Sequence, residues 1–153
     1  MSAPAVHPLR FIIVRLAGRD FAVPAARICG MLLRNTATLR PGQPAGPLRY
    51  SLELQSRSVP VLVPHALLGL EERSPSSRAC LLLIRDASRH PAPPPADAAF
   101  ALAVDSVSRL EEIPPSLYRA PGRVRLGEAW RDVLDPDQLY RTALAEAASP
   151  VTK

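Results

Sequence analysis

The side chains that could perform acid–base, nucleophilic or metal chemistry are few and scattered in this sequence. Its three histidines, His7, His65 and His90, have no cysteine, second histidine or carboxylate at a spacing typical of a metal site. Cys29 and Cys80 lie in separate apolar stretches, where a thiol usually behaves as a small buried hydrophobic group, although a disulfide between them stays open. These residues predict no metal site and no cofactor.

Sequence motifs of the common enzyme classes are also missing. The chain has no Gly-x-Ser-x-Gly elbow, and Gly42 and Gly46 are not followed by the Lys-Ser/Thr pair that a phosphate-binding loop requires. The adjacent carboxylates Glu71–Glu72 and Glu111–Glu112 would point to opposite sides of a strand, so we expect them to be solvated. The sequence therefore predicts no catalytic residues, and it favours a binding protein over an enzyme.

The composition fits one domain. With 153 residues, 47% of them hydrophobic, the chain can bury a substantial core, which argues against wholesale disorder. Its 18 prolines, against 7 glycines, favour short strands and extended connectors over long helices. We expect a single domain over residues 9–147, with tails at 1–9 and 148–153.

The net charge of +5 comes from 19 basic and 14 acidic residues, and every basic residue except Lys153 is an arginine. These arginines are spread along the chain, so they do not outline a nucleic-acid footprint. Residues 1–8 lack the cationic and apolar regions of a signal peptide, and no apolar run approaches the roughly 20 residues that span a membrane. These features predict a cytoplasmic protein without membrane insertion.

Residues 99–117 contain the most informative pattern of the chain. Large apolar residues alternate with small alanines over 100–104, as expected for a strand with one well-filled face. Asp105 interrupts this run, and a second run continues to Pro114–Pro115, where strand pairing must stop. The stretch predicts a buried strand, a bend at Asp105–Ser106 and a second strand.

Other apolar runs predict further short strands. Residues 11–16 and 21–23 flank a turn at 17–20 and predict a hairpin. The remaining runs that predict strands are 52–54, 59–63 and 80–84. Pro60 lacks a backbone donor, which indicates an edge position or the start of a strand.

Helices and connectors fill the rest of the chain. The spacing of Ile28, Met31 and Leu32 predicts a short helix over 25–33. A single helical turn is expected at 65–70. The segments that predict connectors are 34–47, 71–78 and the proline-rich 89–96.

The C-terminal segment gives the strongest helix prediction. Asp135 is a good N-cap and Pro136 suits the first helical position. Leu134 and Leu139 are placed to form a hydrophobic staple, and the helix should end near Ala148. Many short strands and one terminal helix together predict an all-β, barrel-like domain.

The order of these elements resembles the CheW-like domain family. Residues 100–117, FALAVDSVSRLEEIPPSL, resemble the second half of that domain, where a Val-Asp strand pair is followed by a hydrophobic-Pro step. The ending 130–139 is similar to the family's closing Leu-Asp segment, and the resemblance covers roughly residues 9–144. It implies two intertwined SH3-like five-stranded β-barrel subdomains with short helices and a C-terminal helix.

The same resemblance implies a function. CheW-like proteins are non-catalytic adaptors of bacterial chemosensory signal transduction. They link the cytoplasmic tip of a chemoreceptor to the regulatory domain of a CheA-like histidine kinase. We therefore expect a chemotaxis scaffold that acts by protein–protein interaction, either in a standard array or in a divergent one such as a pilus-motility array.

The loop before Pro60 departs from the family pattern. Where family members carry Gly-x-x-Asn-Leu-Arg-Gly, only Leu54 agrees, and Gln55 takes the place of the arginine associated with partner contacts. In the family, a groove between the barrels takes apolar contacts from the receptor tip. The residues that we expect to bind partners are Ile28, Met31, Leu32, Leu54, Gln55 and Arg57. Core packing of the apolar members, and a plain exposed loop for the polar ones, are the alternative interpretations.

Two other functions stay open. A small basic β-barrel could bind nucleic acid, but its possible stacking residues are not neighbours in the sequence; they are Tyr50, Tyr118, Trp130 and Tyr140. A CheW-like fold could also have been repurposed for another protein partner. We expect protein partners and no nucleic acid.

Overall fold

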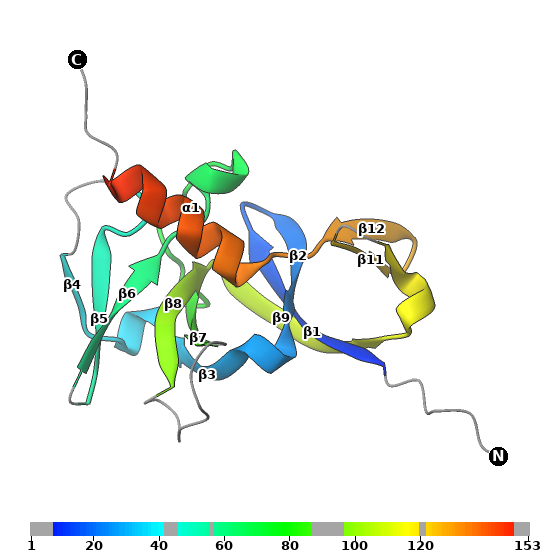
Figure 1. The fold of residues 1–153 in the computed structure, drawn as a ribbon, viewed down its shortest axis with the longest axis horizontal. Coiled ribbons are helices and arrows are strands. Elements are labelled where there is room, and N and C mark those ends of the chain that lie inside the picture. The colour runs from blue at the N-terminus through cyan, green and yellow to red at the C-terminus, as the bar shows by residue number, and fades with distance from the viewer. Residues whose placement is uncertain (1–7, 42–45, 56, 87–96, 120–121, 149–153) are drawn as a thin grey trace.

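The described part of the chain forms three β-sheets and one α-helix (Figure 1). This computed structural model describes residues 8–41, 46–55, 57–86, 97–119 and 122–148. The strands are β1 (Leu9–Leu16), β2 (Arg19–Pro24), β3 (Ile28–Leu33), β4 (Leu39–Pro41), β5 (Tyr50–Leu54), β6 (Arg57–Leu62), β7 (Cys80–Arg85), β8 (Ala98–Val104), β9 (Ser106–Ile113), β10 (Tyr118–Arg119), β11 (Arg123–Leu126) and β12 (Ala129–Asp132). The helical segments are α1 (Pro136–Ala148) and the short 3₁₀ turns η1 (Ala25–Arg27), η2 (Arg34–Thr36), η3 (Ala66–Leu68) and η4 (Pro115–Leu117).

A six-stranded mixed sheet with the strand order β3-β7-β8-β6-β5-β4 forms one half of the molecule. Its strands pair antiparallel except β6 and β8, which are parallel. The two edge strands, β3 and β4, follow each other in the chain through η2, so the sheet curls around its own core. Arg34 closes part of the gap, because its guanidinium lies over the Tyr50 ring at 5.3 Å from the ring centre.

The other half contains two three-stranded sheets with the orders β2-β1-β9 and β10-β11-β12. The β1–β2 hairpin turns through Ala17 and Gly18, both with positive φ, as a two-residue hairpin requires. Figure 1 shows β11 and β12 at one end of the molecule and β4 and β5 at the other, with β1, β2 and β9 between them. The domain is therefore mostly β with one C-terminal helix. Among the described strands no sheet closes into a barrel, so the expected pair of SH3-like barrels is not confirmed.

The core has three connected parts. The largest lies between β1, β2, β7, β8 and α1, and its fully buried side chains include Val14, Leu82 and Phe100. A second part fills the curl of the six-stranded sheet, and a third lies beneath the small β10–β11–β12 sheet around Val124. The alternation predicted over 100–104 is confirmed as a buried central strand.

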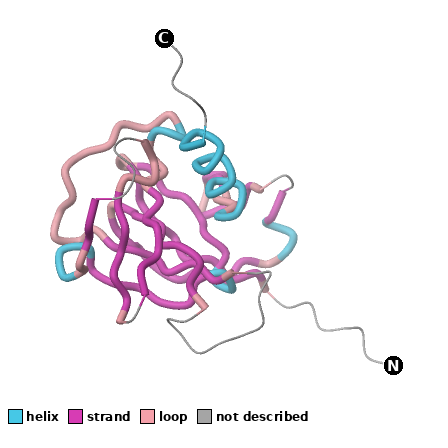
Figure 2. Tube along the Cα trace, turned by 60° about the vertical axis from the view of Figure 1, so that its left-hand side comes forward, coloured by secondary structure: helices cyan, strands magenta, loops and turns pink. Residues whose placement is uncertain are grey.

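The terminal helix forms where it was predicted. The Asp135 carboxylate accepts hydrogen bonds from the backbone N–H groups of Asp137 and Gln138, which makes it the N-cap. Leu134 and Leu139 pack in the same core, and Tyr140 stacks on Phe100 with 4.4 Å between ring centres. Figure 2 shows α1 lying outside the strands, against one side of the molecule. In the described residues, no helix combines the length and apolar character needed to cross a membrane.

Arg27 ties the helix to the sheets. Its guanidinium donates to both carboxylate oxygens of Asp137, at 2.6 and 2.9 Å, and to the carbonyl oxygen of Arg85 at 2.6 Å. The pKa of Asp137 is lowered, mainly because Arg27 donates these bonds to its carboxylate. This contact fixes the first turn of α1 beside η1.

Several element predictions were wrong. The helix predicted over 25–33 is only the 3₁₀ turn η1, followed by strand β3, because β7 supplies an antiparallel hydrogen-bond partner for residues 28–33. The connector predicted over 34–47 contains η2 and β4. Pro60 was expected at a sheet edge or a strand start, but it lies within β6, an interior strand. The pairing of β6 with β8 begins only at the next residue, Val61.

The strands β10, β11 and β12 were not predicted. By contrast, the predicted hairpin, the bend at Asp105 and the paired strands around 80–84 and 100–104 are confirmed. The predicted tail at 1–9 already enters β1 at Leu9. Several predictions concern segments outside the described residues. These are the tail residues 1–7, which include His7, the loop at 89–96, which includes His90, and the C-terminal residues 149–153.

Candidate protein-interaction surface

Asp105 joins the two halves of the molecule at the point where β8 passes into β9. Its backbone N–H donates to the Arg15 carbonyl oxygen at 3.0 Å, and one carboxylate oxygen accepts from the Ala17 N–H at 2.7 Å. The other oxygen lies 3.0 Å from Nε2 of His65, whose side chain is only 3% exposed. Because an ionised carboxylate only accepts hydrogen bonds, Nε2 is the donor. The aspartate thus fixes the β1–β2 turn, η3 and the bend to one another.

A cleft of about 520 Å³ opens beside this joint, between the ends of the six-stranded sheet and the β2-β1-β9 sheet. We call it the inter-sheet cleft. Its apolar surface comes from Leu33, Cys80 and Val107. Its polar lining comes from Arg15, Ser77, Arg78, Ser106 and Ser108. The cleft combines an apolar strip with two cationic side chains.

β3 forms one border of the inter-sheet cleft and is an edge strand of its sheet. Met31 and Leu33 are 47% and 48% exposed, while Leu32 between them points into the core. An unpaired strand edge can template contact with another chain, and two exposed apolar side chains on it make this edge a candidate contact surface. Sequence reasoning chose Met31 but missed Leu33, because a helix was assumed here.

The turn between β5 and β6 forms a second, separate feature. Gln55 is exposed at φ +42°, in the left-handed region that few non-glycine residues adopt. It lines a shallow hollow of about 310 Å³ with Glu53, Arg57 and Ser58. Glu53 is paired with Arg40 of β4, so an acidic and a basic side chain border Gln55.

The structure therefore brings some predicted residues together and separates others. Gln55 and Arg57 meet at the β5–β6 turn, whereas Met31 lies on the far edge of the sheet. Leu54 is only 7% exposed and packs with Leu32 in the second core part, and Ile28 packs against the largest part. Direct contact with a partner is therefore geometrically easiest for Met31, Gln55 and Arg57.

The two thiols are partly buried, and Cys80 also lines the inter-sheet cleft. Burial, followed by a hydrogen bond to Asp97, raises the pKa of Cys29 to about 11, and burial also raises the pKa of Cys80. Both cysteines are free. Among the described residues, no group of three or more histidine, cysteine or acidic side chains could hold a metal ion. The thiols lack the lowered pKa that nucleophilic cysteines need.

Comparison with known proteins identifies the family. Residues 10–136, most of the chain, match the CheW-like domain. The chain belongs to the CheW-like domain family. A solved structure, the scaffolding protein TtCheW from Thermoanaerobacter tengcongensis, is similar with a TM-score of 0.69 over 84% of this chain and 89% of that one, at 11% sequence identity. No curated protein matches this chain significantly.

The Val-Asp pattern of residues 104–105, which the sequence shares with the CheW-like family, has a structural role in this domain. The valine ends the central strand β8, and the aspartate bonds the two halves of the CheW-like domain together. The inter-sheet cleft lies directly beside that joint. Membership in this family supports a chemotaxis coupling adaptor and a non-enzymatic role.

Proposed function

We propose that this chain is an adaptor that binds a chemoreceptor tip and the regulatory domain of a CheA-like histidine kinase in a bacterial chemosensory array. The observation that carries the proposal is the CheW-like match over residues 10–136. The function requires two protein-binding surfaces on one domain, and we assign these roles to the inter-sheet cleft and to the β5–β6 turn. We further propose that residues 9–147 act as one domain in the cytoplasm.

The inter-sheet cleft fits the receptor. An apolar helix face can bury Leu33 of the cleft together with Met31, two residues earlier on β3, each about half exposed. Acidic or carbonyl groups beside it can pair with Arg78 and with Arg15, which also pairs with Asp20. Fully burying a leucine or methionine side chain contributes about 1.5–3 kcal/mol. Because Met31 and Leu33 are already about half buried, each can contribute roughly half of that to a contact. Val107 supplies the opposite wall.

We assign the β5–β6 turn to the kinase contact, where this chain carries less positive charge than the family pattern. Gln55 stands where the family has an arginine, so a charged contact is replaced by a neutral amide. Arg57 begins β6 next to the same hollow and retains one positive charge there. We propose that the partner's matching surface is less acidic than that of a standard kinase.

The placement of the aromatic rings favours a protein over a nucleic acid. The guanidinium groups of Arg34 and Arg49 both lie over the Tyr50 ring, each 5.3 Å from its centre. Tyr140 is stacked on Phe100. Rings already covered in this way are poor platforms for bases, whereas arginine and aromatic groups are common in protein interfaces.

Co-elution tests this proposal directly. The purified chain is mixed with the regulatory domain of the CheA-like kinase of its own cell and analysed by size-exclusion chromatography. A shared peak is expected. Absence of a complex, together with tight and salt-sensitive binding to RNA, would replace the adaptor by the nucleic-acid alternative.

The departure at Gln55 can be tested with a single substitution. Gln55→Arg restores the family residue, so binding to a standard kinase regulatory domain should strengthen by about tenfold, as expected for one charge-assisted contact. Glu128→Gln in the exposed turn between β11 and β12 raises the net charge by the same amount away from this hollow and serves as a control for general charge effects. An unchanged affinity of Gln55→Arg for that kinase would mean that the turn is not the contact.

A further inference from the structure

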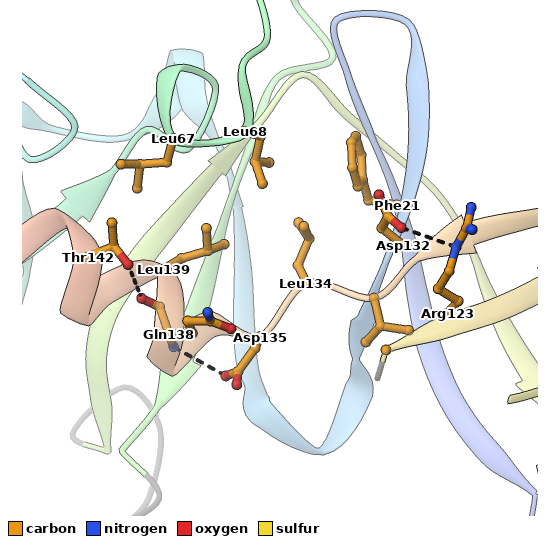
Figure 3. Close-up of a pocket in the computed structure, with 12 residues that line it drawn as sticks. Phe21, Leu67, Leu68, Arg123, Asp132, Leu134, Asp135, Gln138, Leu139 and Thr142 are labelled. Carbon is orange, nitrogen blue, oxygen red and sulfur yellow. Dashed lines mark hydrogen bonds and ion pairs between the residues drawn. The ribbon is translucent and has the colours of Figure 1, made fainter. Parts of the chain in front are cut away.

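A second cleft is lined by residues that belong to none of the surfaces described above (Figure 3). It has a volume of about 510 Å³ and opens between the first turn of α1, η3, β2 and the β11–β12 hairpin. We call it the helix cleft. Figure 3 shows Leu67 and Leu68 of η3 on one side and Leu139 of α1 facing them, with Phe21 and Leu134 beyond. The leucines of η3 and α1 are only half-buried, so the cleft offers an apolar floor.

One wall of the helix cleft continues into a strongly basic sheet face. The pairing register places Arg119 opposite Arg123 and Arg125 opposite Trp130 on the same side of the β10–β11–β12 sheet. The Arg119 guanidinium lies over the Trp130 ring, 4.4 Å from its centre. We call these four residues the arginine–tryptophan face. Arg123 belongs to both the face and the cleft wall.

The positive charge of this face is only partly compensated. Arg123 pairs with Asp132 at 3.4 Å, with both side chains about half exposed. Within the described residues, neither Arg119 nor Arg125 forms an ion pair with a carboxylate. The Asp135 carboxylate in the cleft wall is already used by the N–H groups at the start of α1. Two guanidinium groups thus lack an anionic partner beside an apolar floor.

From this juxtaposition we propose that the helix cleft and the arginine–tryptophan face bind an acidic amphipathic helix of a partner protein. The apolar side of the helix covers Leu67, Leu68 and Leu139, and its flanking carboxylates reach Arg119 and Arg125. Carboxylates one helical turn apart are separated by about 5–6 Å. Arg119 and Arg125 are diagonal neighbours on the paired strands β10 and β11, where the spacing is about 7–8 Å, and their long side chains can span the difference. This surface is distinct from the inter-sheet cleft and the β5–β6 turn, so it goes beyond the proposed coupling role.

The chemistry of the site favours carboxylates on a protein over a phosphate backbone. Asp132 lies within the basic row and would repel a continuous polyanion, whereas a helix can place an apolar or neutral residue against it. Trp130 has its ring covered by Arg119 and is not a free stacking platform. The apolar floor also requires an apolar surface on the ligand, which neither a polyphosphate nor a purely acidic tail provides.

The test uses a fluorescent synthetic peptide of about 18 residues, five helical turns, with leucines on one face and glutamates on its flanks. Fluorescence anisotropy with the full chain should show saturable binding that weakens as NaCl rises, because the contact is partly electrostatic. Arg125→Gln should weaken it about fivefold to tenfold. Arg10→Gln removes the same charge from the exposed β1–β9 pair and should leave it unchanged.

Two peptide controls and two other ligands complete the experiment. Replacing the leucines by serine, or the glutamates by lysine, should abolish binding. The proposal is overturned if the peptide does not bind, or if Arg125→Gln and Arg10→Gln behave alike. It is equally overturned if single-stranded DNA or phosphatidylserine vesicles bind more tightly than the peptide and lose affinity with Arg125→Gln. Gln55→Arg should not change peptide affinity, which separates this surface from the kinase contact.

Discussion

Replacing Asp105 by alanine should destabilise the domain by removing the joint between its two halves. The substitution removes the acceptor of the Ala17 N–H and leaves the almost fully buried Nε2–H of His65 without its partner. A hydrogen bond to a charged acceptor contributes about 1.5–3 kcal/mol, and a buried donor left unpaired costs about 1–3 kcal/mol. Because the Asp105 side chain is 33% exposed, water replaces part of the first term. We expect a loss of about 2–4 kcal/mol, or roughly 4–16 °C in melting temperature.

Urea denaturation monitored by circular dichroism measures this loss. A double-mutant cycle with His65→Ala should give a coupling energy above about 0.5 kcal/mol, since the two side chains share one contact. Glu112→Ala, which breaks an exposed pair with Arg10, is the matched control and should cost less than about 1 kcal/mol. If Asp105→Ala were no more destabilising than Glu112→Ala, or if the cycle showed no coupling, Asp105 would not be the joint described here.

Three further substitutions or reactions test other parts of the structure. Asp137 has a lowered pKa, so its pair with Arg27 stabilises the fold above the ordinary pKa of 3.8, and this stabilisation is lost as the pH falls below that value. The free energy of unfolding of Asp137→Asn should therefore fall less steeply with decreasing pH below about pH 4 than that of the unchanged chain. Equal slopes would contradict the pair. Ala17 has φ +51°, so Ala17→Gly should be neutral or stabilise by up to about 1 kcal/mol in thermal melts, and a clear loss would exclude that turn. In a Cys80→Ser variant, the partly buried Cys29, with its raised pKa, should react with a thiol reagent at pH 8 more slowly in the folded chain than in urea, and equal rates would contradict that environment.

Local patterns were sufficient to predict the strands around Asp105 and the terminal helix. The alternation of large and small apolar residues over 100–104 has the period of a strand, and both of its faces are buried in the structure. Asp135–Pro136 combines two independent helix-start signals. What the Asp105 side chain does could not be predicted, because its partners Ala17 and His65 are 88 and 40 residues away in the chain.

The candidate site was harder to predict than the fold. Ile28, Met31 and Leu32 match a helical spacing with only three residues, and the pairing of β3 with β7 overrides that local preference. The strand places Leu32 inside and exposes Leu33, so the contact residue was missed by one position. The arginine–tryptophan face was missed because it assembles from strands β10 to β12, whose alternating Arg-Val-Arg-Leu run before Gly127 is short. The alternation of that run and the glycine after it were the sequence features that could have indicated this hairpin.

Isothermal titration of the chemoreceptor cytoplasmic tip into this chain tests the adaptor account most directly. The account predicts a saturable complex that Leu33→Ser weakens by about tenfold, because the half-exposed leucine borders the inter-sheet cleft. Leu144→Ser, which changes a leucine of similar exposure on α1, should leave the affinity unchanged. Absence of binding, or equal losses for the two variants, would contradict the claim that the inter-sheet cleft binds the receptor.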